Sequence, residues 1–294
     1  MNKEGREQML AVERRNLILE KLQDERKVVV SELSALFDVS EETIRRDLDK
    51  LDRQGMAIKS YGGAVLNENS GLDMPFNVRK KRNSRAKQEI AALVSGLVQE
   101  GEHIIVDPST TAVAVVKALK NRKKLTVVTS SIEVLIELSD VSGWEVICTG
   151  GTLRENYLTL TGARAVDMIR SFNADKVILS CKGLDMEKGA TDAHEMLSQL
   201  KQAMLQSARQ RILAVDHSKF GNVAFSRICE PADIDIVVTD IRPEQKWLDF
   251  FAEKGIECLY GGESGGGEFE EYGRSNVEEG DGCKDEDDNH SLRQ

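Results

Sequence analysis

Five short segments of the sequence gather side chains that bind phosphate groups and sugars in proteins. Hydroxyls and backbone amides at helix starts suit a phosphate, lysines add positive charge, and carboxylates suit sugar hydroxyls. Serine, threonine and glycine dominate three of the segments, and lysine with aspartate marks the other two. The segments are residues 107–111, 129–131, 149–151, 182–185 and 216–219.

Each segment follows a short apolar run rich in β-branched residues, and helical stretches separate most of these runs. Strands that are buried on both faces and alternate with helices predict an open, mostly parallel α/β sheet. In such a sheet, ligands bind at the carboxyl ends of the strands. The predicted helices include residues 84–100, 111–119, 132–138 and 195–208. The predicted strands are residues 103–106, 125–128, 145–148, 176–179, 212–215 and 234–238.

This arrangement predicts a binding site for a phosphorylated sugar. Each segment alone is a weak signal, because serine and threonine loops are commonly helix caps and Lys219 alone could be any surface lysine. Five such segments at successive strand ends favour a common site. The predicted ligand-binding residues are Asp107, Ser109, Thr110, Thr111, Thr129, Ser130, Ser131, Gly150, Gly151, Lys182, Asp185 and Lys219.

An enzyme is the competing interpretation of the same segments. Asp107, Lys182, Asp185 and Lys219 could act as acid–base groups of a sugar-phosphate isomerase or a kinase-like catalyst. No order of Ser, His and Asp or of Cys and His is compelling, so nucleophilic catalysis is not indicated. We interpret Asp192 first as a helix cap, with ligand contact as the lesser alternative.

A second set of residues, near the N-terminus, has the pattern of a DNA-recognition helix. Ile44, Leu48 and Leu51 recur at i, i+4 and i+7, Ser40 is a good N-cap, and Gly55 is the expected glycine after the last turn. Turning the three aliphatic residues inward leaves a polar outer face. That face holds Glu41, Glu42, Thr43, Arg45, Arg46 and Asp49.

The flanking segments predict the scaffold of a winged helix-turn-helix. Before the recognition helix come an amphipathic helix, a β-branched run at residues 28–30 and a short helix capped by Ser31. After it, residues 56–66 predict two short strands that turn at Gly62 and Gly63, which is a wing. A helix held in this way enters the major groove of DNA with its N-terminal residues at the bases.

The side chains of this module suit DNA. Arg45 and Arg46 could each make a bidentate contact with guanine or clamp a phosphate, and Thr43 suits a phosphate oxygen or a thymine methyl. Lys59 and Tyr61 in the wing suit backbone phosphates, and the two turn glycines would allow close approach. The alternative is a protein-docking module whose arginines form surface ion pairs. The predicted DNA contacts are Ser40, Glu42, Thr43, Arg45, Arg46, Lys59 and Tyr61.

The N-terminal pattern resembles that of DeoR-type bacterial transcriptional regulators. The resemblance is carried by VSEETIRRDL at residues 39–48, by Leu51 and Gly55, and by YGGA at residues 61–64. The strand-end segments are similar to the sensor domain of the same family, whose fold is related to that of sugar-phosphate isomerases and which has lost catalysis. The resemblance covers roughly residues 13–255.

The resemblance implies a repressor of a carbohydrate-metabolism operon, relieved by a phosphorylated sugar and without enzymatic activity or a cofactor. Its partners would be double-stranded operator DNA and a second copy of the chain, in a homodimer or homotetramer. Two positions depart from the family pattern, because Ser109 stands where glycine is common and Ser130 where asparagine is common. A side chain at 109 would tighten the phosphate pocket or change its ligand.

Charge is distributed unevenly over the four predicted parts of the chain. The net charge is −10, yet residues 1–87 carry 18 Lys and Arg against 15 Asp and Glu, whereas residues 261–294 carry 3 against 11. A basic cluster could contact phosphates or begin a solvated helix. It comprises Arg79, Lys80, Lys81, Arg82, Arg85 and Lys87. The predicted parts are a DNA-binding domain at 1–66, a linker at 67–83, an α/β sensor at 84–260 and a disordered acidic tail at 261–294.

The remaining composition predicts a reduced, cytoplasmic protein. The five cysteines form no CxxC pair and no histidines stand at metal-ligand spacing, so no metal site is predicted. No N-terminal segment resembles a signal peptide, and no apolar run approaches the roughly eighteen residues that span a bilayer. A membrane partner is therefore not expected.

Overall fold

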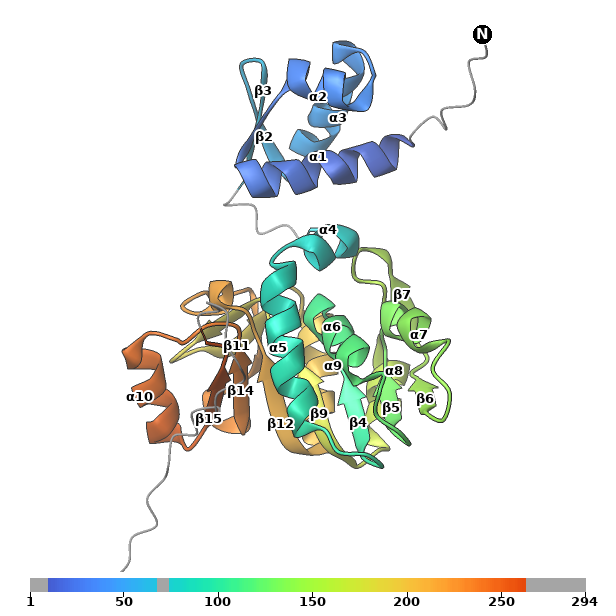
Figure 1. Cartoon of the computed structure of the whole chain (residues 1–294), viewed down its shortest axis with the longest axis vertical. Helices are drawn as coiled ribbons and strands as arrows, with labels where there is room; N and C mark the ends of the chain where they lie inside the picture. Colours follow the sequence, from blue (N-terminus) through green and yellow to red (C-terminus); the bar gives the residue numbers. More distant parts are fainter. Residues whose placement is uncertain (1–9, 68–73, 263–294) are drawn as a thin grey trace, which may run out of the picture.

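The computed structural model describes residues 10–67 and 74–262. Within them the chain forms a small N-terminal domain, here called the head (residues 10–67), and a larger α/β domain, here called the sensor (residues 83–262) (Figure 1). The predicted acidic tail lies outside the described residues from position 263 onward. None of the described helices combines the length and the apolar character needed to cross a membrane.

The head is a winged helix-turn-helix, as predicted. A core that includes Ile18, Leu22, Ile44, Leu48 and Leu51 holds its elements together. Its helices are α1 (Ala11–Glu25), α2 (Val30–Phe37) and α3 (Glu41–Arg53). Its strands are β1 (Lys27–Val29), β2 (Ala57–Ser60) and β3 (Gly63–Leu66), which form an antiparallel sheet in the order β1-β3-β2.

One helix cap in the head was predicted correctly and one was wrong. The Ser40 side chain accepts a hydrogen bond from the Thr43 amide at 3.2 Å and so caps α3. Ser31 does not cap α2, because that helix begins one residue earlier, at Val30. The Val30 amide donates to the Gly62 carbonyl at 2.8 Å, and its side chain is buried in the head core, so the chain turns into the helix there.

The two wing glycines serve the head itself. Gly62 has φ +78°, a left-handed conformation that glycine adopts without strain. A Cβ at Gly63 would stand 2.0 Å from the carbonyl oxygen of Val28, so only glycine lets β3 approach β1. The close approach that Gly63 allows within the head is therefore that of two strands, β3 and β1.

The predicted linker contains a helix, α4 (Phe76–Lys81), which lies between the two domains (Figure 1). Phe76 is buried in the core of the sensor, whereas Val78 is buried in the core of the head. Side chains two positions apart in a helix point about 200° away from each other. One short helix can therefore pack one side chain into each of the two cores. This helix was not predicted within the linker, because six residues are too few to show a helical period.

The sensor is built on a seven-stranded sheet in which every pair of neighbours is parallel, in the order β15-β14-β12-β9-β4-β5-β6. All six predicted strands are present, with ends shifted by up to four residues, and the seventh, β15, was not predicted. The strands are β4 (His103–Val106), β5 (Thr126–Thr129), β6 (Glu145–Cys148), β9 (Ala174–Leu179), β12 (Ala208–Ala214), β14 (Ile236–Thr239) and β15 (Glu257–Tyr260).

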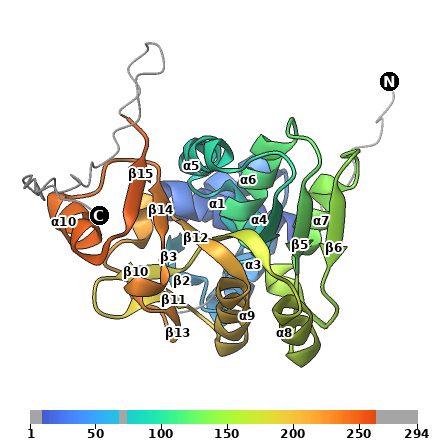
Figure 2. The same cartoon turned by 90° about the horizontal axis from the view of Figure 1, so that it is seen from below.

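Helices cover both faces of this sheet, with α5 and α6 on one side and α8 and α9 on the other (Figure 2). Each face has its own apolar core: Ile104 of β4 points into the first and Ile105 into the second. The sensor helices are α5 (Ser84–Leu97), α6 (Thr110–Leu119), α7 (Ile132–Leu138), α8 (Ala163–Arg170), α9 (Glu195–Gln206) and α10 (Gln245–Lys254).

Two small antiparallel units complete the sensor, and neither was predicted. Their strands are three or four residues long, too short for a clear alternation. One unit is a sheet in the order β10-β11-β13, and the other is the hairpin β7-β8. The strands are β7 (Thr152–Arg154), β8 (Thr159–Thr161), β10 (Gly183–Asp185), β11 (Gly189–Asp192) and β13 (Ser226–Cys229). Three 3₁₀ turns lie at Glu155–Tyr157, His217–Lys219 and Pro231–Asp233.

Candidate functional site

The exposed face of α3 presents two arginines at the N-terminal end of the helix. Arg45 donates to Glu41 at 2.6 Å and Arg46 to Glu42 at 3.1 Å, and the two arginine side chains are 54% and 77% exposed. Exposed pairs of this kind contribute only about 0.3–0.5 kcal/mol, so a DNA phosphate or base can replace the glutamates at little cost. The same pairs are those of the protein-docking alternative, so the contacts alone leave both interpretations open.

The remaining predicted DNA contacts lie at the start of α3 and in the wing. The hydroxyls of Ser40 and Thr43 are 2.9 Å apart at the start of α3. In the wing, Lys59 pairs with Asp49 of α3, and the Tyr61 side chain is fully exposed at the turn. The lysine holds the pKa of Asp49 below its usual value.

A buried ion pair fixes α3 to α1, and sequence reasoning missed it. Asp47 accepts from Arg14 Nε at 2.6 Å and from Arg15 at 3.2 Å. In the sequence, Asp47 stands between the inward positions Ile44 and Leu48. This position could have indicated that Asp47 faces inward. The pair positions the recognition helix from the side opposite its arginines.

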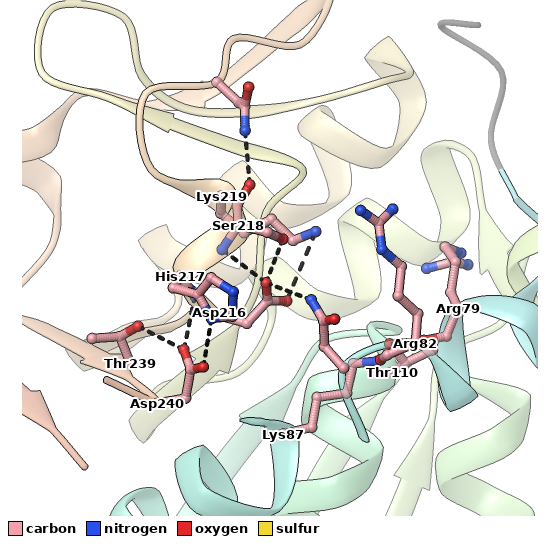
Figure 3. Close-up of polar contacts among 12 residues, drawn as sticks. Arg79, Arg82, Lys87, Thr110, Asp216, His217, Ser218, Lys219, Thr239 and Asp240 are labelled. Atoms are coloured by element: carbon pink, nitrogen blue, oxygen red, sulfur yellow. Dashed lines mark hydrogen bonds and ion pairs between the residues drawn. The ribbon is translucent and has the colours of Figure 1, made fainter. Parts of the chain in front are cut away.

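A pocket of about 680 Å³ lies where the head, α4 and the carboxyl ends of β4, β9 and β12 meet. Figure 3 shows Arg79, Arg82 and Lys87 on one side of it and Asp216 and Lys219 on another. Basic residues outnumber acidic residues in its walls, which suits an anionic ligand. The basic residues are Arg26, Arg79, Arg82, Lys87, Lys182, Lys201 and Lys219, and the acidic residues are Asp192 and Asp216.

Five of the predicted ligand-binding residues line this pocket: Ser109, Thr110, Thr111, Lys182 and Lys219. The first three form the start of α6. The Ser109 hydroxyl accepts from the Ala112 amide at 3.0 Å, so it caps the helix. The backbone amides of Thr110 and Thr111 belong to the first helical turn, where the helix supplies no carbonyl partner.

The structure does not bring residues 129–131 into the pocket. The Thr129 hydroxyl donates to the Val106 carbonyl at 2.8 Å, Ser130 is bonded to Thr159, and Ser131 caps α7. All three are buried. The reason is strand order: β5 lies beyond β4, away from the strand ends that form the pocket.

Gly150, Gly151, Asp107 and Asp185 also lie outside its walls. The two glycines follow β6 at the far edge of the sheet. Asp185 accepts from the amides of two residues in the turn that follows β10. Asp107 is fully buried beneath the pocket, where its carboxylate accepts from the Ser109 and Ser180 amides at 2.9 and 3.0 Å.

A buried charge cluster supports the base of the pocket. Lys201 Nζ lies 2.6 Å from Asp192 and 3.2 Å from Asp107. Burial alone would raise the pKa of Asp192, but the lysine outweighs it and holds that pKa below its usual value. Burial lowers the pKa of Lys201, and the two carboxylates reverse the effect, so its pKa is raised. With all three charged, the cluster is net negative.

This cluster corrects the interpretation of Asp192 as a helix cap. The N-cap of α9 is His194, which makes no side-chain capping bond, and the helix starts at Glu195. Asp192 is in β11, one side of the pocket. The sequence places Asp192 nine residues before Lys201, a separation at which no simple rule predicts contact.

Asp216 connects the two sides of the pocket. Its carboxylate accepts from Asn83 Nδ2 at 3.0 Å and from the Ser218 amide at 3.1 Å, and it lies 3.8 Å from Lys219 Nζ (Figure 3). Burial raises the pKa of Asp216, but Lys219 and the hydrogen bonds outweigh it and keep that pKa low.

Lys87 faces Asp216 from α5. Burial lowers the pKa of Lys87 to about 8, against the opposing effect of that carboxylate. Its ammonium group donates to the backbone carbonyls of Arg79 and Arg82, so it also ties α5 to the end of α4.

The basic cluster near residue 80 therefore divides. Arg79, Arg82 and Lys87 line the pocket, and Asn83 joins them. Lys80, Lys81 and Arg85 pair with Glu133, Glu20 and Glu89 instead. The sequence predicted that the cluster could contact phosphates. It did not predict that three of its members lie in the same pocket as Lys219.

The fold and the pocket define the class of protein: a winged helix-turn-helix joined to an α/β domain that carries a basic pocket. Residues 14–70 match the DeoR-like helix-turn-helix domain, and residues 82–241 match the DeoR C-terminal sensor domain. The chain belongs to the DeoR family of DNA-binding transcriptional regulators.

Relatives cover most of the chain. An uncharacterised HTH-type transcriptional regulator of Bacillus subtilis is 39% identical over 79% of this chain and 90% of its own. The HTH-type transcriptional repressor GlcR of Bacillus subtilis is 35% identical over 85% and 96%. The glycerol-3-phosphate regulon repressor of Escherichia coli is 33% identical over 85% and 98%.

Among solved structures, ribose 5-phosphate isomerase A from Neisseria gonorrhoeae is similar with a TM-score of 0.35 and 13% identity, over 46% of this chain and 52% of that one. A likeness of this size carries no argument about activity.

Proposed function

We propose that the chain is a cytoplasmic repressor of a carbohydrate-metabolism operon whose affinity for operator DNA falls when a phosphorylated sugar binds in the pocket. The observation that carries the proposal is the basic pocket at the start of α6. The names of the relatives, which include a glycerol-3-phosphate regulon repressor, support the same ligand class.

The phosphate would lie against the first turn of α6. The amides of Thr110 and Thr111 and the positive end of the helix dipole favour an anion there. Lys182 and Lys219 line the same cavity and add charge, while Asp216 can accept from sugar hydroxyls. The Ser109 hydroxyl already caps α6. We therefore assign Ser109 to shaping the phosphate site, and not to a direct hydrogen bond with the phosphate.

Calorimetric titration with glucose 6-phosphate, ribose 5-phosphate and glycerol 3-phosphate tests this proposal, with the unphosphorylated compounds beside them. Lys219→Ala should weaken binding of the phosphorylated compound at least tenfold. Lys188→Ala is the matched control, because Lys188 is exposed, pairs with Glu187 and lies outside the pocket. Equal affinity with and without the phosphate group would reject the proposed ligand class.

The enzyme alternative is separated from a sensor by turnover. We infer that the pocket binds without catalysis, as the membership of a regulator family supports. Incubation with each sugar phosphate, followed by product analysis, should show no conversion. Isomerisation that disappears in Lys219→Ala would establish an enzyme instead.

The predicted DNA surface is proposed to act in a homodimer or homotetramer, since helix-turn-helix proteins bind paired half-sites. Light scattering on the protein, alone and with DNA from upstream of its own coding region, measures the assembly. A monomer bound to a single half-site would contradict this part of the proposal.

A further inference from the structure

The walls of the basic pocket come from both domains. Arg26, Leu66 and Asn67 of the head line the same cavity as Lys182 and Lys219 of the sensor. The site is therefore incomplete without the head. A ligand in this cavity lies between the DNA-binding domain and the domain that is expected to sense it.

The head side of the pocket is tied to the recognition helix. Arg26 follows α1 in a left-handed conformation with φ 63°, and its carbonyl accepts from the Leu66 amide at 2.9 Å. Asn67 Nδ2 donates to the carbonyl of Gly55, just past the end of α3, at 2.9 Å. The Asn67 side chain thus links this wall of the pocket to the residue that follows the last turn of α3.

Helix α4 holds the head and the sensor together around the same pocket. Phe76 and Lys80 connect it to the sensor, Lys80 through a 2.8 Å ion pair with Glu133 of α7. Val78 and Lys81 connect it to the head, Lys81 through a 2.8 Å ion pair with Glu20 of α1. In this docked arrangement, packed and paired side chains set the spacing of the two domains at the pocket.

We propose that Arg26 is an effector-binding residue supplied by the head, and that an anionic effector holds the head against the sensor by bridging Arg26 and the sensor lysines. The proposal rests on the phosphorylated-sugar function proposed above and specifies how that site is regulated. A ligand shifts a conformational equilibrium only through contacts that differ between the two states. The contact with Arg26 is such a contact, because it exists only while the head is docked.

This arrangement makes the docked state the one that the effector stabilises. Heads held against their sensors cannot adjust to the spacing of two half-sites, so DNA affinity falls when the effector is bound. By reciprocity, operator DNA weakens effector binding by the same factor.

The test uses the full chain with Arg26→Asn, beside Lys27→Asn as a matched control. Asparagine tolerates the left-handed conformation of residue 26, so the variant removes the charge without straining the turn. Lys27 is the neighbouring exposed cation, and it does not line the pocket. The probe is glucose 6-phosphate, then ribose 5-phosphate and glycerol 3-phosphate, and the DNA is the upstream fragment used above.

In the wild type and in Lys27→Asn, the sugar phosphate should lower DNA affinity by about 5–150-fold, the usual range of allosteric coupling. In Arg26→Asn the drop should shrink to less than twofold, measured against the DNA affinity of the same variant without the ligand, and sugar-phosphate affinity should weaken several-fold. Hydrogen exchange gives a second measurement: the ligand should slow exchange of the Leu66 and Asn67 amides in the wild type and in Lys27→Asn, but not in Arg26→Asn.

The outcomes separate the two proposals. If the wild type binds no sugar phosphate, the proposed function fails and this inference fails with it. If the wild type responds and Arg26→Asn responds equally, with the same change in exchange at residues 66 and 67, the pocket is a sensor site that does not use the head. The proposed function then stands and the inference is overturned.

Discussion

Arg14 Nε donates to Oδ2 of Asp47 across 2.6 Å, and both side chains are almost fully buried between α1 and α3. The recognition helix is thus held by an ion pair that solvent does not reach. Arg15 adds a second bond to the same carboxylate at 3.2 Å. Removing Asp47 would leave an uncompensated buried guanidinium group.

The first prediction concerns this pair. Asp47→Ala should lower the free energy of unfolding by about 3–5 kcal/mol, the usual cost of breaking a buried pair. Denaturant unfolding followed by circular dichroism measures it. Asp49→Ala, two residues away on the exposed side of the same helix, should leave the midpoint close to that of the wild type. Equal effects of the two substitutions would contradict the structural role of Asp47.

The second prediction concerns the exposed arginines. Arg45→Ala and Arg46→Ala should each weaken binding to the upstream DNA by about 1–3 kcal/mol, and Lys59→Ala should reduce the salt dependence by about one charge. Fluorescence anisotropy at several salt concentrations measures both effects. Arg209→Ala, an exposed arginine of the sensor, is the control. If all four variants bind as the wild type does, the protein-docking alternative is favoured.

The third prediction uses the charge cluster beneath the pocket. Lys201→Met leaves Asp107 and Asp192 buried without a cation and should cost about 3–5 kcal/mol of stability at neutral pH. Lys188→Met is the control, because Lys188 pairs with Glu187 at an exposed site. This control should unfold as the wild type does.

The pH dependence of that variant should have the opposite sign to that of the wild type. In the wild type the folded pKa of Asp192 is lowered, so its stabilisation is present above the ordinary aspartate pKa of 3.8 and is lost as pH falls through the lowered pKa. In Lys201→Met, burial acts on Asp192 without the opposing lysine and raises its pKa. The penalty for burying this carboxylate is then relieved as pH falls, and the variant should recover stability relative to the wild type between pH 7 and 5. A constant difference over this range would contradict titration of Asp192 there.

The fourth prediction concerns Lys87, whose pKa burial lowers to about 8. Its ammonium form attracts an anionic ligand and its neutral form does not. From pH 7.5 upward, sugar-phosphate affinity should therefore fall, most steeply above pH 8, by at most about tenfold per pH unit for one proton. The phosphate is already a dianion throughout pH 7.5–9.5, since its second pKa is near 6. Titration over that range measures the effect. Lys87→Gln should flatten the profile, and a flat profile in the wild type would exclude the Lys87 charge from binding.

The elements that sequence patterns predicted best are those whose burial is periodic. Ile44, Leu48 and Leu51 mark one face of α3, and the cap at Ser40 follows from its hydroxyl. The apolar strands of the sensor are similarly visible because both their faces are buried. Local pattern is enough in these cases because the determining contacts lie within a few residues.

The composition of the pocket depends on contacts that local pattern does not contain. Ser109 and Ser131 occupy similar positions, because each caps a helix that follows a β-branched strand. Strand order separates them, so Ser109 lines the pocket and Ser131 does not. Arg79 reaches the pocket because α4 packs on both domains. Asp192 contacts Lys201 because it lies in β11, a strand of the small β10-β11-β13 sheet. Each of these facts belongs to tertiary structure.

Helix α4 also determines where the chain can be divided. A fragment that ends at residue 75 lacks Val78, so its apolar core would contain a void, and a fragment that ends at residue 82 exposes Phe76 to water. Both side chains are at most 2% exposed in the intact chain. A chimeric regulator that joins the head of one relative to the sensor of another would have to match both cores within α4. The head can therefore be transferred only if the turn that holds Phe76 and Val78 is redesigned.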